Sequence, residues 1–260
     1  EEQLKGAAGT AITGTGIGGR ITTADLNNAA AGIGTGTGAI SPADAVKAKP
    51  EEGPAYEEVK IPNIRKVIAK AMHQSLSSMA QLTLNSSFDA TAILEFRKKL
   101  KENKDRLGLE NITINDIIVY AVSRTLLNHR DLNAHFLDDR MLYFKNVNIG
   151  VAVDTERGLM VPTIFNANLK SLNEISAEAK KLIKECQAGT INPDLLRGGT
   201  FTVTNLGTLD VESFTPVINP PQTGILGVCN IVRRAREVDG EYEFYPAMGL
   251  SLTFDHRALD

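Results

Sequence analysis

The chain has 260 residues, of which 42% are hydrophobic and 23% charged, and its net charge is -3. This length predicts one large domain, or one large domain and a small one, with enough apolar side chains to bury a sizeable core. Without a basic excess, the composition gives no support to nucleic-acid binding, and no apolar run approaches the roughly 18 residues that a membrane span needs.

The chain starts with Glu1-Glu2-Gln3, which includes neither an initiating methionine nor the basic segment of a signal peptide. We therefore expect a fragment or a processed chain. The two cysteines, Cys186 and Cys229, have neither CxxC nor metal-ligand spacing. Their pattern predicts a reducing interior and no disulfide framework.

The first 28 residues are rich in glycine and threonine, and the run Gly14–Gly19 fits the pattern GxGxxG. A dinucleotide site needs a strand before this pattern and a long helix after it. Only the short stretch 22–28 follows here, so a loop in a tiny domain is the favoured interpretation. Residues 29–55 consist mainly of alanine, glycine, proline and charged residues, which predicts a flexible linker.

From residue 56 onward, the spacing of apolar residues predicts one globular domain. Helices are expected over 64–76, 92–102, 113–127 and 172–186, the third with Thr113 or Asn115 as its N-cap. Strands are expected over 82–89, 145–153, 159–164, 200–204, 224–233, 241–245 and 249–254. Because helices and strands mix without a regular βαβ alternation, a mixed sheet flanked by helices is favoured over a doubly wound fold.

The last six residues contain the strongest single candidate for catalysis. His256 follows the predicted strand 249–254, and Asp260 lies four residues further on. A histidine at a strand end suits proton transfer near neutral pH, and the carboxylate would fix the geometry around it. On spacing alone, a structural histidine that is hydrogen-bonded to a nearby aspartate is the more common case.

Other polar candidates are weaker. His73 and His129 are expected to be solvated and His135 to lie in the core or a pocket, and no histidine pair has zinc-ligand spacing, so no metal site is expected. Thr204 ends the alternating run Phe201–Thr204. It is either an ordinary β-branched strand residue or a hydroxyl donor aimed at an oxyanion, and spacing alone does not choose between them.

Short motifs follow one another along residues 60–260: Ile64–Met72, Asn133–Phe136, Asn148–Val153, Gly158–Pro162, Gly199–Gly207, Asn219–Gly227 and Asp255–Arg257. In order and spacing, this set resembles the catalytic domain of the dihydrolipoamide acyltransferase component of 2-oxo acid dehydrogenase complexes. The run Gly14–Leu26 is similar to the second half of the small peripheral-subunit-binding domain of the same proteins.

This resemblance implies an α+β fold, a two-layer sandwich of the chloramphenicol acetyltransferase type with a mixed sheet flanked by helices. It also implies a partial peripheral-subunit-binding domain at 1–28, a flexible linker at 29–55 and the catalytic domain at 56–260. The family's lipoyl domain, the first helix of its small domain and its C-terminal helix are not in the chain. A protein truncated at both ends is therefore expected.

The implied activity is transfer of an acyl group between dihydrolipoamide and coenzyme A. His256 would deprotonate the thiol, and Thr204 would stabilise the oxyanion. Asp260 would hold the local structure through an ion pair, with Arg65 as one candidate partner. Arg65 and Asn205 are also candidates for cofactor binding. The family places the site between two subunits of a trimer, with His256 from one chain and Thr204 from the next.

The implied partners are further copies in a homotrimer that builds a larger core. The small domain would bind 2-oxo acid dehydrogenase and dihydrolipoamide dehydrogenase subunits. Nucleic acid, membrane and metal are not expected, and a bacterial cytoplasm is preferred over a mitochondrial matrix. Acetyl is the first choice of acyl group, with succinyl and branched acyl groups left open. One alternative is a non-catalytic core subunit. Such relatives usually lack the histidine, so its presence favours the enzyme. The other alternative is a nucleotide-binding protein, which nothing outside the glycine run supports.

Overall fold

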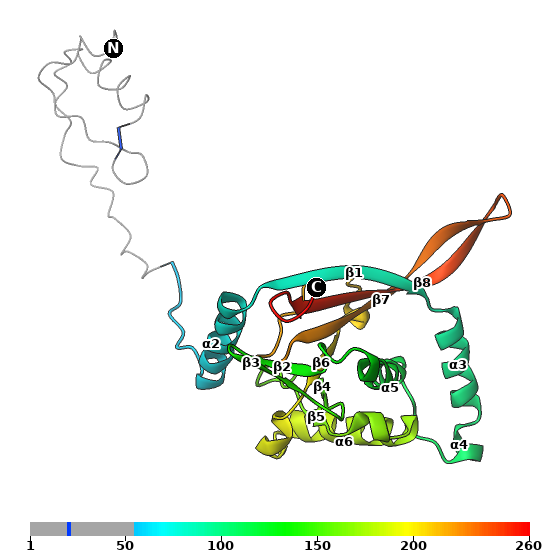
Figure 1. Ribbon diagram of the computed structural model, residues 1–260, viewed down its shortest axis with the longest axis horizontal. Coiled ribbons are helices and arrows are strands. Elements are labelled where there is room, and N and C mark those ends of the chain that lie inside the picture. The colour runs from blue at the N-terminus through cyan, green and yellow to red at the C-terminus, as the bar shows by residue number, and fades with distance from the viewer. Residues whose placement is uncertain (1–19, 22–54) are drawn as a thin grey trace, which may run out of the picture. The chain divides into compact units, whose positions relative to one another are not determined.

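The computed structural model describes residues 20–21 and 55–260. The predicted small domain (1–28), the predicted linker (29–55) and the Gly14–Gly19 run lie outside the described residues, apart from residues 20, 21 and 55, which are exposed and outside any helix or strand. Val59–Asp260 forms one unit, and its elements are labelled in Figure 1.

The helices of this unit are α2 (Asn63–Ser78), α3 (Thr91–Glu102), α4 (Lys104–Leu107), α5 (Ile114–Thr125) and α6 (Leu172–Ala188). Its strands are β1 (Gln81–Asp89), β2 (Ala134–Leu137), β3 (Arg140–Tyr143), β4 (Ile149–Val151), β5 (Thr163–Ile164), β6 (Phe201–Asn205), β7 (Gly224–Val238) and β8 (Glu241–Asp255). Short 3-10 turns occupy Leu126–Asn128, Ala167–Leu169, Pro193–Leu196 and Gly207–Leu209.

The main sheet is mixed, with strand order β1-β8-β7-β6-β4-β5. β6 runs parallel to both of its neighbours, β4 and β7, whereas β8 runs antiparallel to β7 and β1. β2 and β3 form a separate hairpin. The predicted α+β class, with a mixed sheet flanked by helices, is confirmed.

Helices α5 and α6 lie on one face of the sheet (Figure 1). Their buried side chains join its core. Ile175 on α6 and Val119 on α5 pack in one core with Ile149 and Phe201 from the sheet. Thr113, one of the two predicted N-caps, begins α5 with a capping box to Asp116. Asp116 also accepts a hydrogen bond from Ser176 of α6 at 2.8 Å, so the cap ties the two helices together below the sheet.

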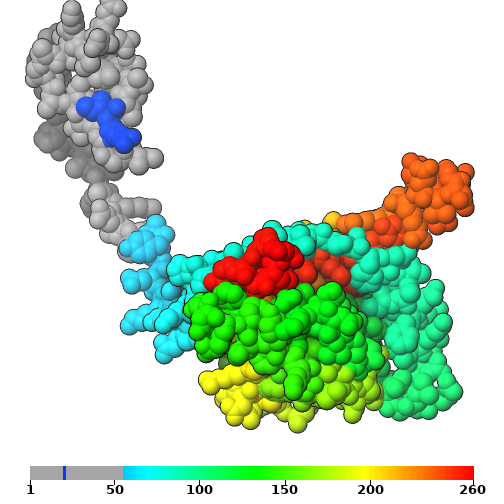
Figure 2. Space-filling model, in the orientation of Figure 1, coloured from blue at the N-terminus to red at the C-terminus, as the bar shows by residue number. Residues whose placement is uncertain are grey.

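The last two strands are longer than the sequence pattern predicts. The expected strands 241–245 and 249–254 are one strand, β8, and β7 extends five residues beyond the predicted end at residue 233. Pro246 lies within β8, next to Ala247, which is the first residue of β8 that pairs with β1. A proline is tolerated at such an edge. Beyond this point β7 and β8 pair only with each other and project as the arm seen in Figures 1 and 2.

Candidate active site

His256 is the first residue after β8, and its backbone is fixed by a hydrogen bond to the Ala80 carbonyl oxygen at 2.8 Å. The Nδ1 atom of its ring lies 3.0 Å from the carbonyl oxygen of Leu259. Because a carbonyl oxygen only accepts, Nδ1 must carry the proton in this contact. In the neutral ring, Nε2 then has a free lone pair. With 45% of its side chain exposed, this nitrogen is available to a substrate.

Asp260 lies close to the same ring but does not orient it. Its Oδ1 is 3.6 Å from Nδ1 of His256, which is too long for a hydrogen bond. The group that fixes the tautomer is therefore the Leu259 carbonyl, which the sequence pattern does not reveal. The suggested ion pair between Asp260 and Arg65 is not formed within this chain, since the Arg65 guanidinium lies beside Gly158.

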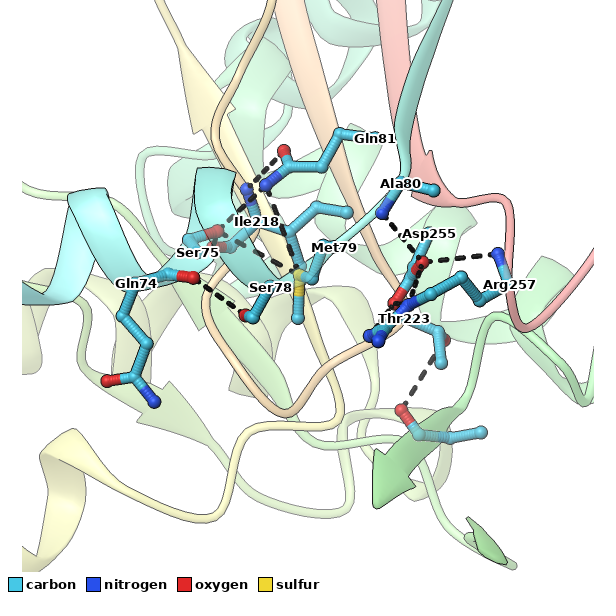
Figure 3. Close-up of polar contacts among 11 residues, drawn as sticks. Gln74, Ser75, Ser78, Met79, Ala80, Gln81, Ile218, Thr223, Asp255 and Arg257 are labelled. Carbon is cyan, nitrogen blue, oxygen red and sulfur yellow. Dashed lines mark hydrogen bonds and ion pairs between the residues drawn. The ribbon is translucent and has the colours of Figure 1, made fainter. Parts of the chain in front are cut away.

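On either side of His256 lie Asp255 and Arg257, which form an ion pair in which Nη2 is 2.7 Å from Oδ2 and Nε is 3.0 Å from Oδ1 (Figure 3). Asp255 is fully buried, and it also accepts from the backbone N–H groups of Ala80 and Arg257. Burial raises the pKa of Asp255, but the hydrogen bonds from Arg257 and Ala80 outweigh it, so the pKa lies below its ordinary value of 3.8.

Thr204 and Asn205 form the end of β6. Thr204 is half-buried, and its hydroxyl has no hydrogen-bond partner among residues 55–260. Asn205 donates to the Asn115 side chain at 3.0 Å and accepts from the backbone of Gly207 at 2.8 Å. The end of β6 is thus held by its asparagine, which leaves the hydroxyl of Thr204 free to donate.

Asn205 opens into a pocket of about 420 Å³ between α3, the start of α5 and the sheet. The pocket also contains Arg97, Asn115, Thr208 and Asn230. The Nε atom of Arg97 is buried and has no hydrogen-bond partner. Apolar side chains such as Ile114, Val228 and Met248 complete the lining. A guanidinium with an unpaired N–H beside amide and hydroxyl groups suits an anion such as a phosphate.

The sequence pattern did not single out Arg97, which lies in the helix expected over 92–102. A signal was present, because Arg97 shares the apolar stripe of α3 with Ile93, Leu94 and Leu100, all half-buried. His135, predicted to lie in the core or a pocket, is half-buried and contacts the Gly199 carbonyl oxygen at 2.9 Å. Within the described residues, no group of three or more His, Cys, Asp or Glu side chains could hold a metal ion, and no helix is long and apolar enough to cross a membrane.

Thr204 and His256 do not meet within one chain. Thr204 pairs with Gly227 of β7, which pairs with Ser251 of β8, five residues before His256. At about 3.4 Å per residue along a strand and about 4.8 Å between strands, their Cα atoms lie roughly 20 Å apart. A site that uses both side chains therefore needs two copies of the chain.

Comparison with known proteins identifies the family. The model of the 2-oxoacid dehydrogenases acyltransferase catalytic domain matches residues 53–260. The chain belongs to this family. The dihydrolipoyllysine-residue acetyltransferase component of the acetoin cleaving system of Bacillus subtilis is 34% identical to it over 249 residues, which cover 96% of this chain. The chain spans about 60% of the length of the curated relatives it matches.

Two solved structures of family members superpose closely, each with a TM-score of 0.75 and 30% identity over 86% of this chain and 90% of the other. One is the cubic core of a pyruvate dehydrogenase multienzyme complex. The other is the dihydrolipoamide acetyltransferase of Azotobacter vinelandii, studied for the role of a serine, a histidine and an asparagine in its catalytic mechanism. In that protein's numbering, the histidine follows the serine by 52 positions and precedes the asparagine by four.

Proposed function

We propose that this chain is the acyltransferase of a 2-oxo acid dehydrogenase complex and that it moves an acetyl group between dihydrolipoamide and coenzyme A. The observation that carries the proposal is the tautomer of His256, whose Nδ1 is tied to Leu259 while Nε2 is left free beside the protein surface. Thr204, His256 and Asp260 also repeat the 52- and four-residue spacing of the Azotobacter vinelandii enzyme, with threonine for serine and aspartate for asparagine.

His256 acts as the general base. A thiol with a pKa near 8.5 is mostly protonated at neutral pH, so Nε2 of His256 removes its proton as the sulfur attacks the thioester carbonyl carbon. The tetrahedral intermediate carries negative charge on the former carbonyl oxygen. When it collapses, the carbon–sulfur bond to the first carrier breaks, and the departing thiolate takes the proton from Nε2.

Thr204 of a second copy stabilises the oxyanion. Its unpaired hydroxyl is a donor, and one such donor contributes on the order of 3 kcal/mol to lowering the barrier. The separation of roughly 20 Å between Thr204 and His256 within one chain supports a site shared between copies. A ring of three copies inside a larger core fits this requirement, and the pyruvate dehydrogenase relative forms a cubic core.

Coenzyme A enters on the side of Thr204. Its phosphates suit the pocket at Asn205, where the buried Nε of Arg97 has no partner. Phosphates prefer a guanidinium over an ammonium because two of its N–H groups donate in parallel. Asn205, a candidate for cofactor binding from the sequence, lines this pocket. Arg65, the other candidate, lies on α2 beside Gly158, and we assign it no role in binding coenzyme A.

The acyl carrier is a lipoyl group, as the name of the Bacillus subtilis relative indicates for that protein. Peripheral dehydrogenase subunits would bind through the N-terminal segment. The names of the similar proteins favour acetyl as the acyl group, since both the acetoin and the Azotobacter vinelandii proteins are acetyltransferases.

The test is acetyl transfer from acetyl-CoA to free dihydrolipoamide, because the free dithiol needs no lipoyl domain. The unmodified protein should form acetyl-dihydrolipoamide, and His256→Ala should lower turnover by at least about 100-fold without changing the assembly mass. A protein that assembles but transfers no acetyl group, or whose turnover is unaffected by His256→Ala, would be a non-catalytic core subunit.

A further inference from the structure

His256 owes its orientation to a charged lock formed by its two neighbours in sequence. The lock consists of the buried carboxylate of Asp255 and the guanidinium of Arg257, and it lies beside Ala80, the residue directly before β1. In the sequence, these residues belong to the motif Asp255–Arg257, and the pattern alone predicts no role for either of them.

The carboxylate of Asp255 holds the turn that carries the histidine. Its Oδ1 accepts from the backbone N–H of Arg257 at 3.2 Å, while its own carbonyl oxygen accepts from the N–H of Ala258 at 2.8 Å. These are the contacts of a β-turn reinforced by an aspartate side chain at its first position. His256 occupies the second position of that turn, so its backbone direction follows from the carboxylate.

The same carboxylate joins the turn to the rest of the sheet. It accepts from the N–H of Ala80, whose carbonyl oxygen accepts from the N–H of His256 at 2.8 Å. Asp255 also donates its backbone N–H to the Thr223 carbonyl oxygen at 2.9 Å. The histidine is thus anchored from both sides by elements far apart in the sequence.

Arg257 completes the lock by neutralising the buried charge. Its guanidinium makes a two-point contact with Asp255 and lies over the Phe136 ring of the β2–β3 hairpin, with 4.4 Å between the guanidinium carbon and the ring centroid. A guanidinium held by both a carboxylate and an aromatic face has little freedom. The turn therefore cannot rotate without breaking several contacts together.

We infer that Asp255 and Arg257 are positioning residues that hold the turn 255–259 so that the Leu259 carbonyl selects the Nδ1–H tautomer of His256. The inference rests on the proposed function, because the tautomer matters for catalysis only if Nε2 is the base. Neither residue needs to touch substrate. A displacement of about 1 Å in a reacting group can cost about 100-fold in rate.

The test uses two variants that keep part of the lock. Asp255→Asn retains an oxygen acceptor for the backbone N–H groups but loses the charge, and Arg257→Lys retains the charge but loses the two-point contact. The matched control is Asp89→Asn, which removes another carboxylate–arginine contact, to Arg236 at 2.8 Å on the arm. The purified protein is labelled with ¹⁵N-histidine, and the His256 signal among the four histidines is assigned with His256→Ala.

In both lock variants, the ¹⁵N shifts of His256 should change from the Nδ1–H tautomer to a mixture, and kcat should fall about tenfold or more. The KM for acetyl-CoA should stay within about twofold, because the Arg97 pocket lies at the other end of the sheet. Asp89→Asn should leave the spectrum and kcat unchanged. If one lock variant does not fold, the other variant alone tests whether the lock sets the tautomer of His256 and kcat.

The inference is overturned if a folded lock variant keeps both the wild-type tautomer and the wild-type kcat, or if the Asp89→Asn control changes them equally. A failure of the proposed function gives a different result. In that case His256→Ala retains acetyl transfer, while the ¹⁵N spectrum still shows whether Asp255 and Arg257 set the tautomer.

Discussion

Thr204, next to the last residue of β6, and His256, the first residue after β8, lie toward opposite ends of the same sheet. β6 is parallel to β7 and β8 is antiparallel to it, so the carboxyl ends of β6 and β8 point in opposite directions. No side-chain rotation closes a separation of roughly 20 Å between the two Cα atoms. Any chemistry that needs both groups must therefore take place between two copies of the chain.

Mixing two inactive variants should restore activity. In an equal mixture of His256→Ala and Thr204→Ala chains that reassemble at random, roughly a quarter of the interfaces join an intact histidine to an intact threonine. Acetyl transfer should thus recover to about a quarter of the wild-type rate, measured after joint unfolding and refolding. Each variant refolded alone is the control. A mixture no more active than the sum of the two would place the site within one chain.

Replacing Thr204 should show how much its hydroxyl contributes to kcat. Thr204→Ala removes a hydroxyl that donates to no other group among residues 55–260, so kcat should fall by about 100-fold or more. Thr204→Ser keeps the hydroxyl and should retain most of the rate. The KM for dihydrolipoamide should change little, since the donor acts on the charge of the intermediate. Steady-state kinetics of the two variants decide this, and equal losses in both would assign the effect to packing instead.

Arg97 should control the affinity for coenzyme A. Loss of a charged hydrogen bond costs about 1.5–3 kcal/mol, so Arg97→Met should raise the KM for acetyl-CoA by about 10- to 100-fold, with little change in kcat. Lys98→Met is the matched control, because Lys98 is the next residue on α3 but is exposed. If both variants had the same KM as the wild type, the phosphates would bind elsewhere.

Asp255 should contribute to stability against acid. Its pKa is depressed in the folded state below the ordinary value of 3.8, so the folded protein binds the proton less readily than the unfolded chain. The contribution is therefore complete above about pH 5 and is lost as the pH falls through the depressed pKa. Asp255→Asn should lower the free energy of unfolding by about 1–3 kcal/mol at neutral pH.

Urea unfolding between pH 2.5 and 7 measures this difference. The gap between the wild type and Asp255→Asn should be constant at neutral pH and should shrink in acid. A gap that stays constant down to the lowest pH would show that the charge of Asp255 does not stabilise the fold.

The sequence predicted the fold class and most element positions because apolar periodicity and capping are local. Thr113 begins α5 as expected, and the predicted helix over 172–186 corresponds to α6. The errors arise where tertiary pairing overrides a local signal. The sequence pattern predicts two strands, 241–245 and 249–254, but pairing with β7 continues across residues 246–248, so that β8 runs unbroken to Asp255.

For the candidate site, the sequence by itself predicted the candidates, which are His256, Thr204, Asp260, Arg65 and Asn205. Only the tertiary structure decided what surrounds them. It showed that the Leu259 carbonyl, and not Asp260, selects the tautomer, that Asp255 pairs with Arg257, and that Arg97 lacks a partner in its pocket. A residue's chemistry is encoded locally, whereas distances between segments far apart in the chain depend on how the strands pair.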